Sequence, residues 1–349
     1  MEKNSGVKIL FVDGTKGFSP DRLKNKPCGG IITSMTLIPR YLMNQGYDVY
    51  VLSTDYKLKV TVNGIKYIKS VSDVEPDIVV FNRNIISNAM CEFYRESKKV
   101  WWLHDIVDYR YLDDDGFKKA DRVVALSGYC ASSYSDFYGA KKGSYTIIPN
   151  GVDETIYYPP TKKRNKNLYI VASAPIKGLA PLPYTIHNLK RANPDVEVRI
   201  YSSQKLHDME NTAKMESQLA TLKEAGATIC DPISQRDLAD VMREAWALLM
   251  PNQYPEICSN LLLQALACGT PTVTVPIGSQ PEYIIHEKNG LCTSTFPHDQ
   301  YWWFKDFALQ TMRLSADEKL HEKICKNAPK NIPTWSEIGD KWLKMLRRL

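Results

Sequence analysis

Residues 254–269 read YPEICSNLLLQALACG, and this stretch predicts a loop followed by a helix. Ser259 is a favourable N-cap residue in front of an apolar run at helical spacing. Gly269 supplies a left-handed stop, and Pro271 prevents the helix from continuing. Residues 272–275 are then typical of a short buried strand. The stretch therefore predicts a loop, a helix and a strand in close succession.

The start of this helix is a candidate anion site. The first backbone N–H groups of a helix have no partner within it, so they point at whatever lies in front of the helix. Glu256 stands in the preceding loop, and Gln264 follows on the helix. An acidic side chain can bind hydroxyl groups while backbone amides hold phosphate. This combination suits a bound nucleotide-sugar.

Composition indicates a globular protein of two domains. The chain has 349 residues, of which 44% are apolar and 24% charged. The net charge of +6 permits contact with phosphates or an anionic membrane surface, but no nucleic-acid recognition motif accompanies it. The eight cysteines form no Cys-x-x-Cys pair, which favours reduced thiols in the cytosol. Residues 9–12 are too few for a signal peptide, and no apolar stretch approaches the roughly 18 residues of a membrane span. We expect a cytoplasmic protein that does not bind nucleic acid.

Strand and helix patterns alternate along both halves of the chain, which predicts two doubly wound parallel sheets. In the first half we expect a helix at 31–44, interrupted by Pro39, and strands at 7–12, 48–53, 78–81, 100–103, 122–126 and 146–148, with helical segments between several of the later strands. In the second half we expect helices at 182–192, 215–225 and 238–245, with strands at 168–172, 196–201, 228–230 and 247–250. Pro281 is expected to open a further helix that ends at Asn289 and Gly290.

A polar, basic stretch at 159–167 separates the two halves and resembles a linker. We therefore expect an N-terminal domain at 1–158 and a C-terminal domain at 159–334. The cations of Lys162–Arg164 are expected to be solvated. Residues 335–349 are predicted to form a final helix that packs back toward the N-terminal domain.

Ligands of doubly wound sheets bind beyond the carboxyl ends of the strands. That rule selects Asn82–Arg83, His104–Asp105 and Ser127 in the first half, and Lys177–Gly178 in the second. Gly29–Gly30, in front of the first helix, can bring backbone close to a phosphate or sugar. Each has a plainer interpretation as well, because isolated histidines are often structural, and lysines and glycines are common beside turns.

Several sharper motifs are absent or disfavoured. Asp113–Gly116 follows no apolar run, so an exposed turn is favoured over a metal site. There is no Ser/His/Asp triad or glycine-rich Walker loop. The segment after the first strand also lacks a Gly-x-Gly-x-x-Gly motif, which argues against hydride transfer. Tyr301–Phe304 opens an amphipathic stretch, for which core packing is favoured over membrane contact.

Taken together, these residues resemble a family-four retaining glycosyltransferase of the GT-B type, in which two Rossmann-like domains face an interdomain cleft. Glu256 with the helix that follows, and Ala267–Pro271 after it, resemble the family's Glu, seven residues, Glu motif and its small-residue-Gly-x-Pro segment. Ile148–Asp153 resembles the interdomain Pro-Asn-Gly-Val-Asp segment. The weaker matches are Gly29–Gly30, His104, Lys177–Gly178, and Pro281–Glu282 with Asn289–Leu291.

The resemblance implies roles for individual residues. The implied catalytic residues are Glu256, His104 and Lys177. The implied donor contacts are Gly29, Gly30, Ile233, Ile257, Cys258, Ser259, Asn260 and Gln264. The implied acceptor contacts are Asn82 and Asp105. No metal or other cofactor is expected, because a lysine and helix N-termini can stabilise the departing diphosphate.

The resemblance implies transfer of a hexose-type sugar from a nucleotide-diphospho-sugar to a glycan, lipid or small-molecule acceptor, with retention of configuration. Gln264 stands where the family has its second glutamate, and no arginine stands shortly before Lys177. These departures keep a second hypothesis open, namely a nucleotide-sugar-binding or regulatory protein on a weakened scaffold. A nucleotide-sugar epimerase or hydrolase is a third. Peripheral contact with a membrane surface and the oligomeric state are left open.

Overall fold

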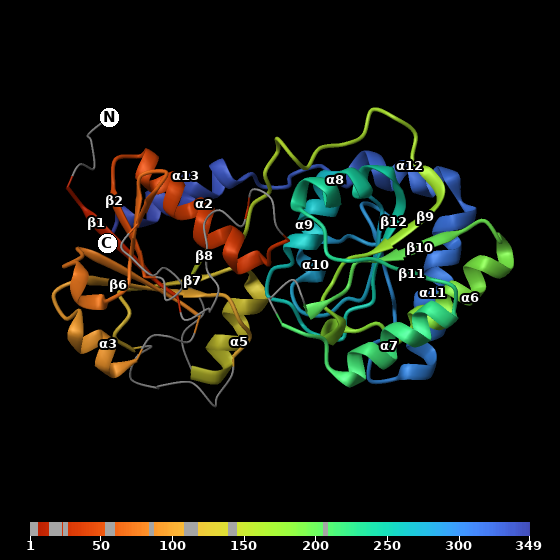
Figure 1. The fold of residues 1–349 in the computed structure, drawn as a ribbon, viewed down its shortest axis with the longest axis horizontal. Coiled ribbons are helices and arrows are strands. Elements are labelled where there is room, and N and C mark those ends of the chain that lie inside the picture. The colour runs from red at the N-terminus through yellow and green to blue at the C-terminus, as the bar shows by residue number, and fades with distance from the viewer. Residues whose placement is uncertain are drawn as a thin grey trace. The chain divides into compact units, whose positions relative to one another are not determined.

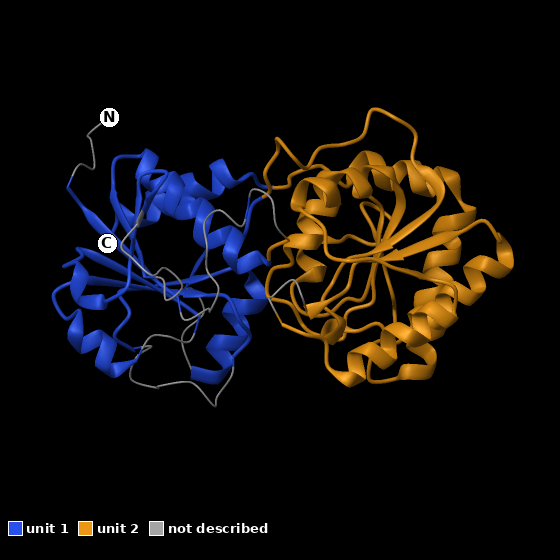
Figure 2. Ribbon diagram, viewed as in Figure 1, with its two compact units in different colours: residues 1–23, 29–151, 333–349 blue, residues 24–28, 152–332 orange. Residues whose placement is uncertain are grey.

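The computed structural model describes residues 6–13, 23, 27–52, 60–83, 87–107, 118–138, 145–204 and 209–349. The chain divides into two compact α/β units (Figure 2). Unit 1 consists of residues 1–23, 29–151 and 333–349, and unit 2 consists of residues 24–28 and 152–332. Each unit has its own sheet and is described by itself.

Unit 1 is built on an eight-stranded sheet with the order β3-β4-β2-β1-β5-β6-β7-β8. Figure 1 labels β1, β2, β6, β7 and β8 of this sheet. All neighbouring strands pair in parallel except β3 and β4. The strands are β1 (Lys8–Val12), β2 (Asp48–Leu52), β3 (Val60–Val62), β4 (Ile65–Ile68), β5 (Ile78–Asn82), β6 (Lys98–Leu103), β7 (Arg122–Ala125) and β8 (Tyr145–Ile147). The chain winds outward from β1 in one direction and then restarts at β5 in the other. The β1–β5 pair is therefore the topological switch point of this sheet.

The helices of unit 1 come from both ends of the chain. They are α2 (Gly30–Asn44), the 3₁₀ turn η1 (Val71–Asp73), α3 (Asn88–Phe93), α5 (Gly128–Tyr138) and the C-terminal α13 (Trp335–Leu346). Helix α13 packs on α2, and Trp342 lies fully buried against Trp102 of β6, with 4.8 Å between ring centroids. Pro39 is buried inside α2, which continues through it to Asn44.

Unit 2 is built on a six-stranded parallel sheet with the order β11-β10-β9-β12-β13-β14. The strands are β9 (Asn165–Val171), β10 (Glu197–Ile200), β11 (Thr228–Ile229), β12 (Ala245–Met250), β13 (Thr272–Thr274) and β14 (Leu291–Cys292). The chain winds from β9 through β10 to β11 and then returns to β12 on the other side of β9. The switch point of this sheet is the β9–β12 pair.

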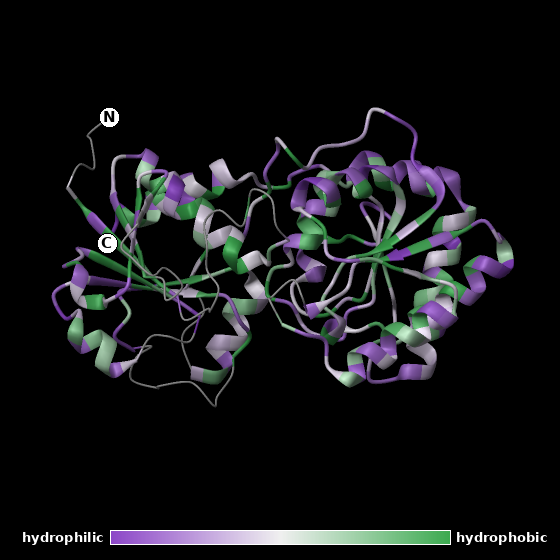
Figure 3. Cartoon of the chain, in the orientation of Figure 1, coloured by the Kyte–Doolittle hydropathy of each residue, from purple (hydrophilic) through white to green (hydrophobic). Residues whose placement is uncertain are grey.

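Helices cover both faces of the second sheet. They are η2 (Pro175–Lys177, a 3₁₀ turn), α6 (Leu182–Ala192), α7 (Ala213–Glu224), α8 (Gln235–Glu244), α9 (Asn260–Ala267), α10 (Gln280–Tyr283), α11 (Gln300–Ala316) and α12 (Glu318–Asn327). Tyr169 and Val171 belong to a core shared with α6, α7 and α11, whereas Leu168 and Ile170 belong to a core shared with α8 and α9. This alternation is the period-two pattern of a strand that is buried on both faces. Hydrophobic residues accordingly line the strands in Figure 3.

Two expectations for the region between the units are corrected. Strand β9 begins inside the expected linker, and Arg164 is half-buried rather than solvated: its guanidinium donates to the carbonyl oxygens of Met242 (2.6 Å) and Cys268 (2.6 Å). Unit 2 begins at Val152 instead of 159, because Val152 and Tyr157 are buried in the core on the α8–α9 face.

The helix expected to run from Pro281 to Asn289 is also corrected. Helix α10 ends at Tyr283, and the Asn289 side chain closes the turn that follows by accepting from Ile285 N (2.7 Å) and donating to Tyr283 O (2.8 Å). The β3–β4 hairpin and α12 were not predicted.

A buried histidine makes the stability of unit 2 depend on pH. His321 stacks on Trp246 with ring centroids 3.3 Å apart, and its Nε2 lies 2.9 Å from Trp246 O. Burial lowers the pKa of His321 from 6.5 to about 4. As the pH falls from 6.5 toward 4, His321 therefore takes up a proton in the unfolded chain but stays neutral in the folded chain. The free energy of unfolding decreases over that pH interval.

We expect the contribution of His321 to the free energy of unfolding to fall by about 2 kcal/mol between about pH 8 and pH 5. Urea unfolding of the wild type and of His321→Gln at both pH values measures it, since the variant lacks this proton uptake. His187→Gln, at an exposed position of α6, is the matched control. Equal pH dependence in the wild type and His321→Gln would contradict the expectation.

Candidate functional site

The switch point of unit 2 brings together two residues that are far apart in sequence. Lys177 ends the η2 turn that follows β9, and Glu256 lies in the loop that follows β12, the neighbouring strand. The Lys177 ammonium forms an ion pair with Glu256 Oε1. The Glu256 side chain is 7% exposed and that of Lys177 is 34% exposed. A carboxylate that is nearly buried needs such partners, because desolvation penalises its charge.

Backbone contacts hold these two loops against each other. Gln253 N donates to Lys177 O (2.7 Å). Gly178 has a φ of +120°, and a Cβ at this position would lie 2.8 Å from Pro251 O. The positive φ and the lack of space for a Cβ both require glycine at position 178. The position of the Lys177 backbone is therefore set by the loop that carries Glu256.

The Glu256 segment is held from two further sides. Asn252 Nδ2 donates to Glu256 Oε2 (3.2 Å), so each carboxylate oxygen has its own partner. Ser279 N donates to Glu256 O (2.8 Å). Gly278 lies so close that a Cβ would come within 2.5 Å of Glu256 O, and its φ is +61°. Glu256 is thus fixed before any ligand binds.

Helix α9 starts four residues after Glu256, as the sequence predicts. Ser259 is its N-cap residue, with extended backbone (φ −84°, ψ 109°), but its side chain makes no capping hydrogen bond. Gly269 ends the helix with a φ of +64°, and Thr270 N donates to Ala265 O (2.8 Å). The predicted start and stop of this helix are confirmed. Asn260, its first residue, follows Glu256 closely in the chain, so the structure gathers the ion pair and a helix start at one switch point.

The remaining donor candidates of unit 2 differ in position. Gln264 lies on α9 and is buried, and Ile257 is buried in the loop before that helix. The Cys258 thiol lies 3.5 Å from the Tyr283 hydroxyl of α10. Ile233 lies in the loop between β11 and α8, and β11 is two strands away from β9 in the sheet.

The switch point of unit 1 carries a buried polar pair. Asn82 ends β5 and donates through Nδ2 to Asp13 Oδ2 (3.1 Å), and Asp13 directly follows β1. Both side chains are buried. Asp13 was missed by the sequence analysis, although its place directly after the first strand is the signal that selected Asn82.

His104 directly follows β6 and is buried, with its ring 4.3 Å from that of Trp102. Burial, and then the Arg83 guanidinium, lower the pKa of His104 from 6.5 to about 3. The imidazole is therefore neutral near pH 7, and among the described residues its Nε2 has no hydrogen-bond partner. Asp105, a predicted acceptor contact, forms an ion pair with Arg83, whose Nε lies 3.0 Å from Asp105 Oδ2.

Gly29 and Gly30 stand at the start of α2. Gly29 is the N-cap residue with φ −76° and ψ 168°, values that any residue can adopt. Its backbone oxygen accepts from Thr33 N (3.3 Å). The Asp113–Gly116 motif lies outside the described residues. In the part of the chain that the structure describes, no three or more His, Cys, Asp or Glu side chains gather as metal ligands would.

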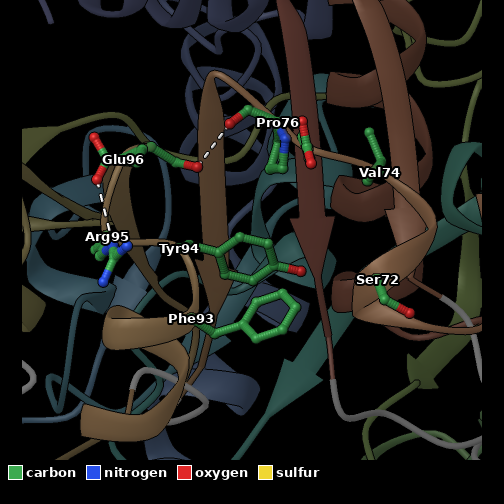
Figure 4. A pocket seen from close by; sticks show the side chains of 9 residues that line it. Ser72, Val74, Pro76, Phe93, Tyr94, Arg95 and Glu96 are labelled. Atoms are coloured by element: carbon green, nitrogen blue, oxygen red, sulfur yellow. Dashed lines mark hydrogen bonds and ion pairs between the residues drawn. The ribbon is translucent and has the colours of Figure 1, made fainter.

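A hollow of about 510 Å³ lies elsewhere in unit 1 (Figure 4). Residues 72 and 74–76 before β5 and residues 93–97 before β6 line it, including the Phe93 and Tyr94 rings. The Ser97 hydroxyl donates to Pro76 O (2.6 Å). These segments precede the amino ends of the strands, whereas Asn82 and His104 lie at the carboxyl ends. The hollow is therefore separate from the candidate residues.

Both a protein family and individual known proteins are similar in sequence to this chain. Residues 165–301 match the family described as "Glycosyl transferases group 1". D-inositol 3-phosphate glycosyltransferase of Nocardiopsis dassonvillei is 22% identical over 262 residues, which is 67% of this chain and 57% of that protein. Alpha-maltose-1-phosphate synthase of Mycolicibacterium smegmatis is 22% identical over 259 residues, covering 68% and 66% of the two chains. The chain spans about half the length of the first relatives it matches, between 46% and 57%.

Solved structures share the fold over the whole chain. Sucrose-phosphate synthase from Thermosynechococcus elongatus superimposes with a TM-score of 0.80 at 15% identity, covering 98% of each chain. Anabaena Alr3699/HepE in complex with UDP gives a TM-score of 0.73 at 16% identity, covering 98% of this chain and 100% of that chain. The predicted fold, GT-B with two Rossmann-like units, is confirmed. Over the described residues, no helix is long and apolar enough to cross a bilayer.

Proposed function

We propose that the protein is a retaining glycosyltransferase, because residues 165–301 match the family model for glycosyl transferases group 1. It moves a sugar from a nucleotide-diphospho-sugar to an acceptor. The observation that carries the proposal is the Lys177–Glu256 ion pair at the switch point of unit 2, beside the start of α9. Ligands of such sheets bind at this position.

In unit 2 the proposed roles follow from charge. The Lys177 ammonium and the first-turn amides of α9 offset the negative charge that develops on the departing diphosphate. The Glu256 carboxylate accepts hydrogen bonds from hydroxyls of the donor sugar. Ile233, Ile257, Cys258 and Gln264 are the further proposed donor contacts, with Gln264 at the ribose.

In unit 1 the proposed roles come from the family resemblance. His104 contacts the donor sugar, and its neutral imidazole supports a hydrogen-bonding role in place of a cationic one. Gly29 and Gly30 approach the phosphates with their backbone, since neither has a side chain. Asn82 and Asp105 contact the acceptor.

We propose that transfer needs no metal ion, because Lys177 and the α9 amides supply the positive charge at the diphosphate. UDP-glucose is the first donor to test, since Anabaena Alr3699/HepE was solved with it. We expect it, or another nucleotide-sugar, to raise the melting temperature in the presence of EDTA. A ligand at 100 times its dissociation constant contributes about 2.7 kcal/mol to the free energy of unfolding.

Sugar release or transfer is then followed chromatographically with the stabilising donor, with and without EDTA. The proposal fails if no nucleotide-sugar stabilises the protein. Stabilisation without turnover on any acceptor would indicate a binding protein, and turnover that requires a divalent metal would contradict only the metal-free mechanism.

The same assay, run with glycans, lipids and small molecules as candidates, identifies the acceptor. Tyr301 and Trp302 at the start of α11 are 61% and 57% exposed, and Lys305 Nζ lies 4.1 Å and 5.3 Å from the two ring centroids. These side chains support peripheral contact with an anionic membrane surface, which co-sedimentation with phosphatidylserine vesicles would test.

A further inference from the structure

Asn252 is a buried side chain of unit 2 to which the family resemblance gives no role. It lies two residues after β12 and has no solvent exposure. Its Nδ2 donates to Glu256 Oε2 (3.2 Å). Its Oδ1 is buried and accepts no hydrogen bond from the residues that the structure describes. A buried amide oxygen without a donor is costly, so a ligand or an ordered water is its expected partner.

The two oxygens of Glu256 have different kinds of partner. The Lys177 ammonium holds Oε1, and the Asn252 amide holds Oε2. A diphosphate that attracts Lys177 weakens the first contact, because both anions then compete for one cation. The amide contact carries no net charge and is not subject to this competition. It can keep the carboxylate oriented while Lys177 turns to the phosphate.

We propose that Asn252 is the positioning residue of Glu256 and that its Oδ1 accepts a hydrogen bond from a hydroxyl of the donor sugar. The inference rests on the proposed function, since it assigns a specificity residue to the same site. Asparagine suits both tasks because one amide group donates and accepts at the same time. Alanine at position 252 leaves Glu256 Oε2 without its donor, and aspartate places a second carboxylate against the first.

The first test compares Asn252→Ala with the wild type. We expect kcat/KM for the nucleotide-sugar to fall about tenfold to a hundredfold, the usual consequence of removing one partner of a buried hydrogen bond. The affinity for the corresponding nucleoside diphosphate, measured by calorimetry, should stay within about twofold, because the sugar is missing from that ligand. Equal losses for both ligands would indicate a merely structural role and overturn the proposal.

Asn252→Asp supplies a pH-dependent version of the same test. At hydrogen-bond distance two carboxylates do not both ionise readily, so the pair takes up a proton as the pH falls. A hydrogen bond through that shared proton replaces the lost hydrogen bond from Asn252 Nδ2 to Glu256 Oε2. We expect the activity of Asn252→Asp, relative to the wild type, to recover between about pH 8 and pH 5. Asn252→Ala should show no such recovery, since it has no group that can regain the contact.

The charged groups that the structure records next to Asn252 are Glu256 and, through it, Lys177. A readout that needs no ligand checks the contact itself. The melting temperature of Asn252→Asp, relative to the wild type, should rise as the pH falls over the same interval, because the shared proton is held more tightly in the folded state. Asn188→Asp on α6 is the matched control and should show no such rise.

These measurements distinguish a failure of the proposed function from a failure of the role assigned to Asn252. A wild type that neither binds nor turns over any nucleotide-sugar refutes the proposed function, and with it the role at the donor. An active wild type whose kcat/KM is unchanged in Asn252→Ala refutes the inference alone. A melting temperature of Asn252→Asp that does not respond to pH also refutes it, since the contact with Glu256 is then absent.

Discussion

Glu256→Gln is expected to lose most sugar transfer while it still binds the nucleoside diphosphate. Glutamine keeps the shape of the side chain but removes the charge that holds Lys177 and attracts the sugar hydroxyls. We expect kcat/KM to fall about a hundredfold to a thousandfold, the range for removing one preorganised electrostatic contact. Lys177 is at the same time released from its carboxylate partner. The affinity for the nucleoside diphosphate should therefore be unchanged or higher.

Steady-state kinetics with the stabilising donor and calorimetry with the nucleoside diphosphate measure the two effects. Glu224→Gln, at an exposed position near the end of α7, is the matched control and should behave like the wild type. A Glu256→Gln enzyme with wild-type kcat/KM would show that Glu256 does not act on the donor sugar. A large loss of nucleoside diphosphate affinity would show instead that the substitution has disturbed the phosphate half of the site.

Lys177→Met is expected to give the opposite pattern, with loss of both transfer and diphosphate binding. The methionine side chain retains most of the apolar stem of lysine but carries no charge. We expect kcat/KM to fall about a hundredfold to a thousandfold, because the departing diphosphate loses its cation. The affinity for the nucleoside diphosphate should fall as well, which separates this variant from Glu256→Gln.

The same substitution leaves the nearly buried Glu256 carboxylate without its cation, so Lys177→Met should also be less stable than the wild type. Chemical unfolding identifies that contribution, and Lys223→Met at an exposed position of α7 is the control. Because the two side chains are in contact, the losses in the Lys177→Met, Glu256→Gln double variant should not be additive. Additive losses, or unchanged nucleoside diphosphate affinity in Lys177→Met, would contradict the assigned role.

The sequence predicted those parts of the fold whose signals are local. Helix α6 has the predicted bounds because its apolar spacing and its ends are both visible along the chain. Gly269 was predicted as a helix stop because only its own backbone conformation is involved. The β3–β4 hairpin was missed, since strands of three and four residues leave little periodic pattern. The prediction of a solvated linker was wrong because the half-buried Arg164 guanidinium donates to carbonyl oxygens that lie about 80 to 100 positions away in the sequence.

In the candidate site, too, individual residues could be predicted from local signals, whereas the contacts between them could not. Glu256 was selected because it stands in the loop before a predicted helix, and Lys177 because it follows a predicted strand. Their ion pair depends on β9 and β12 being neighbours. Asn252 was missed because its importance lies in one hydrogen bond and one unpaired oxygen. No spacing rule reveals either of them. Asp105 was selected by position, and only the structure shows it paired with Arg83.

Helix α13 has a consequence for how the protein is made. Unit 1 contains the first strand of the chain and also residues 333–349, whose Trp342 is fully buried in it. Synthesis proceeds from the N-terminus, and domains generally fold as units. All the residues of unit 2 therefore leave the ribosome before unit 1 has its last helix. The unit that is begun first is the one completed last, so a nascent chain that stops anywhere before Trp342 leaves the apolar face at Trp102 uncovered.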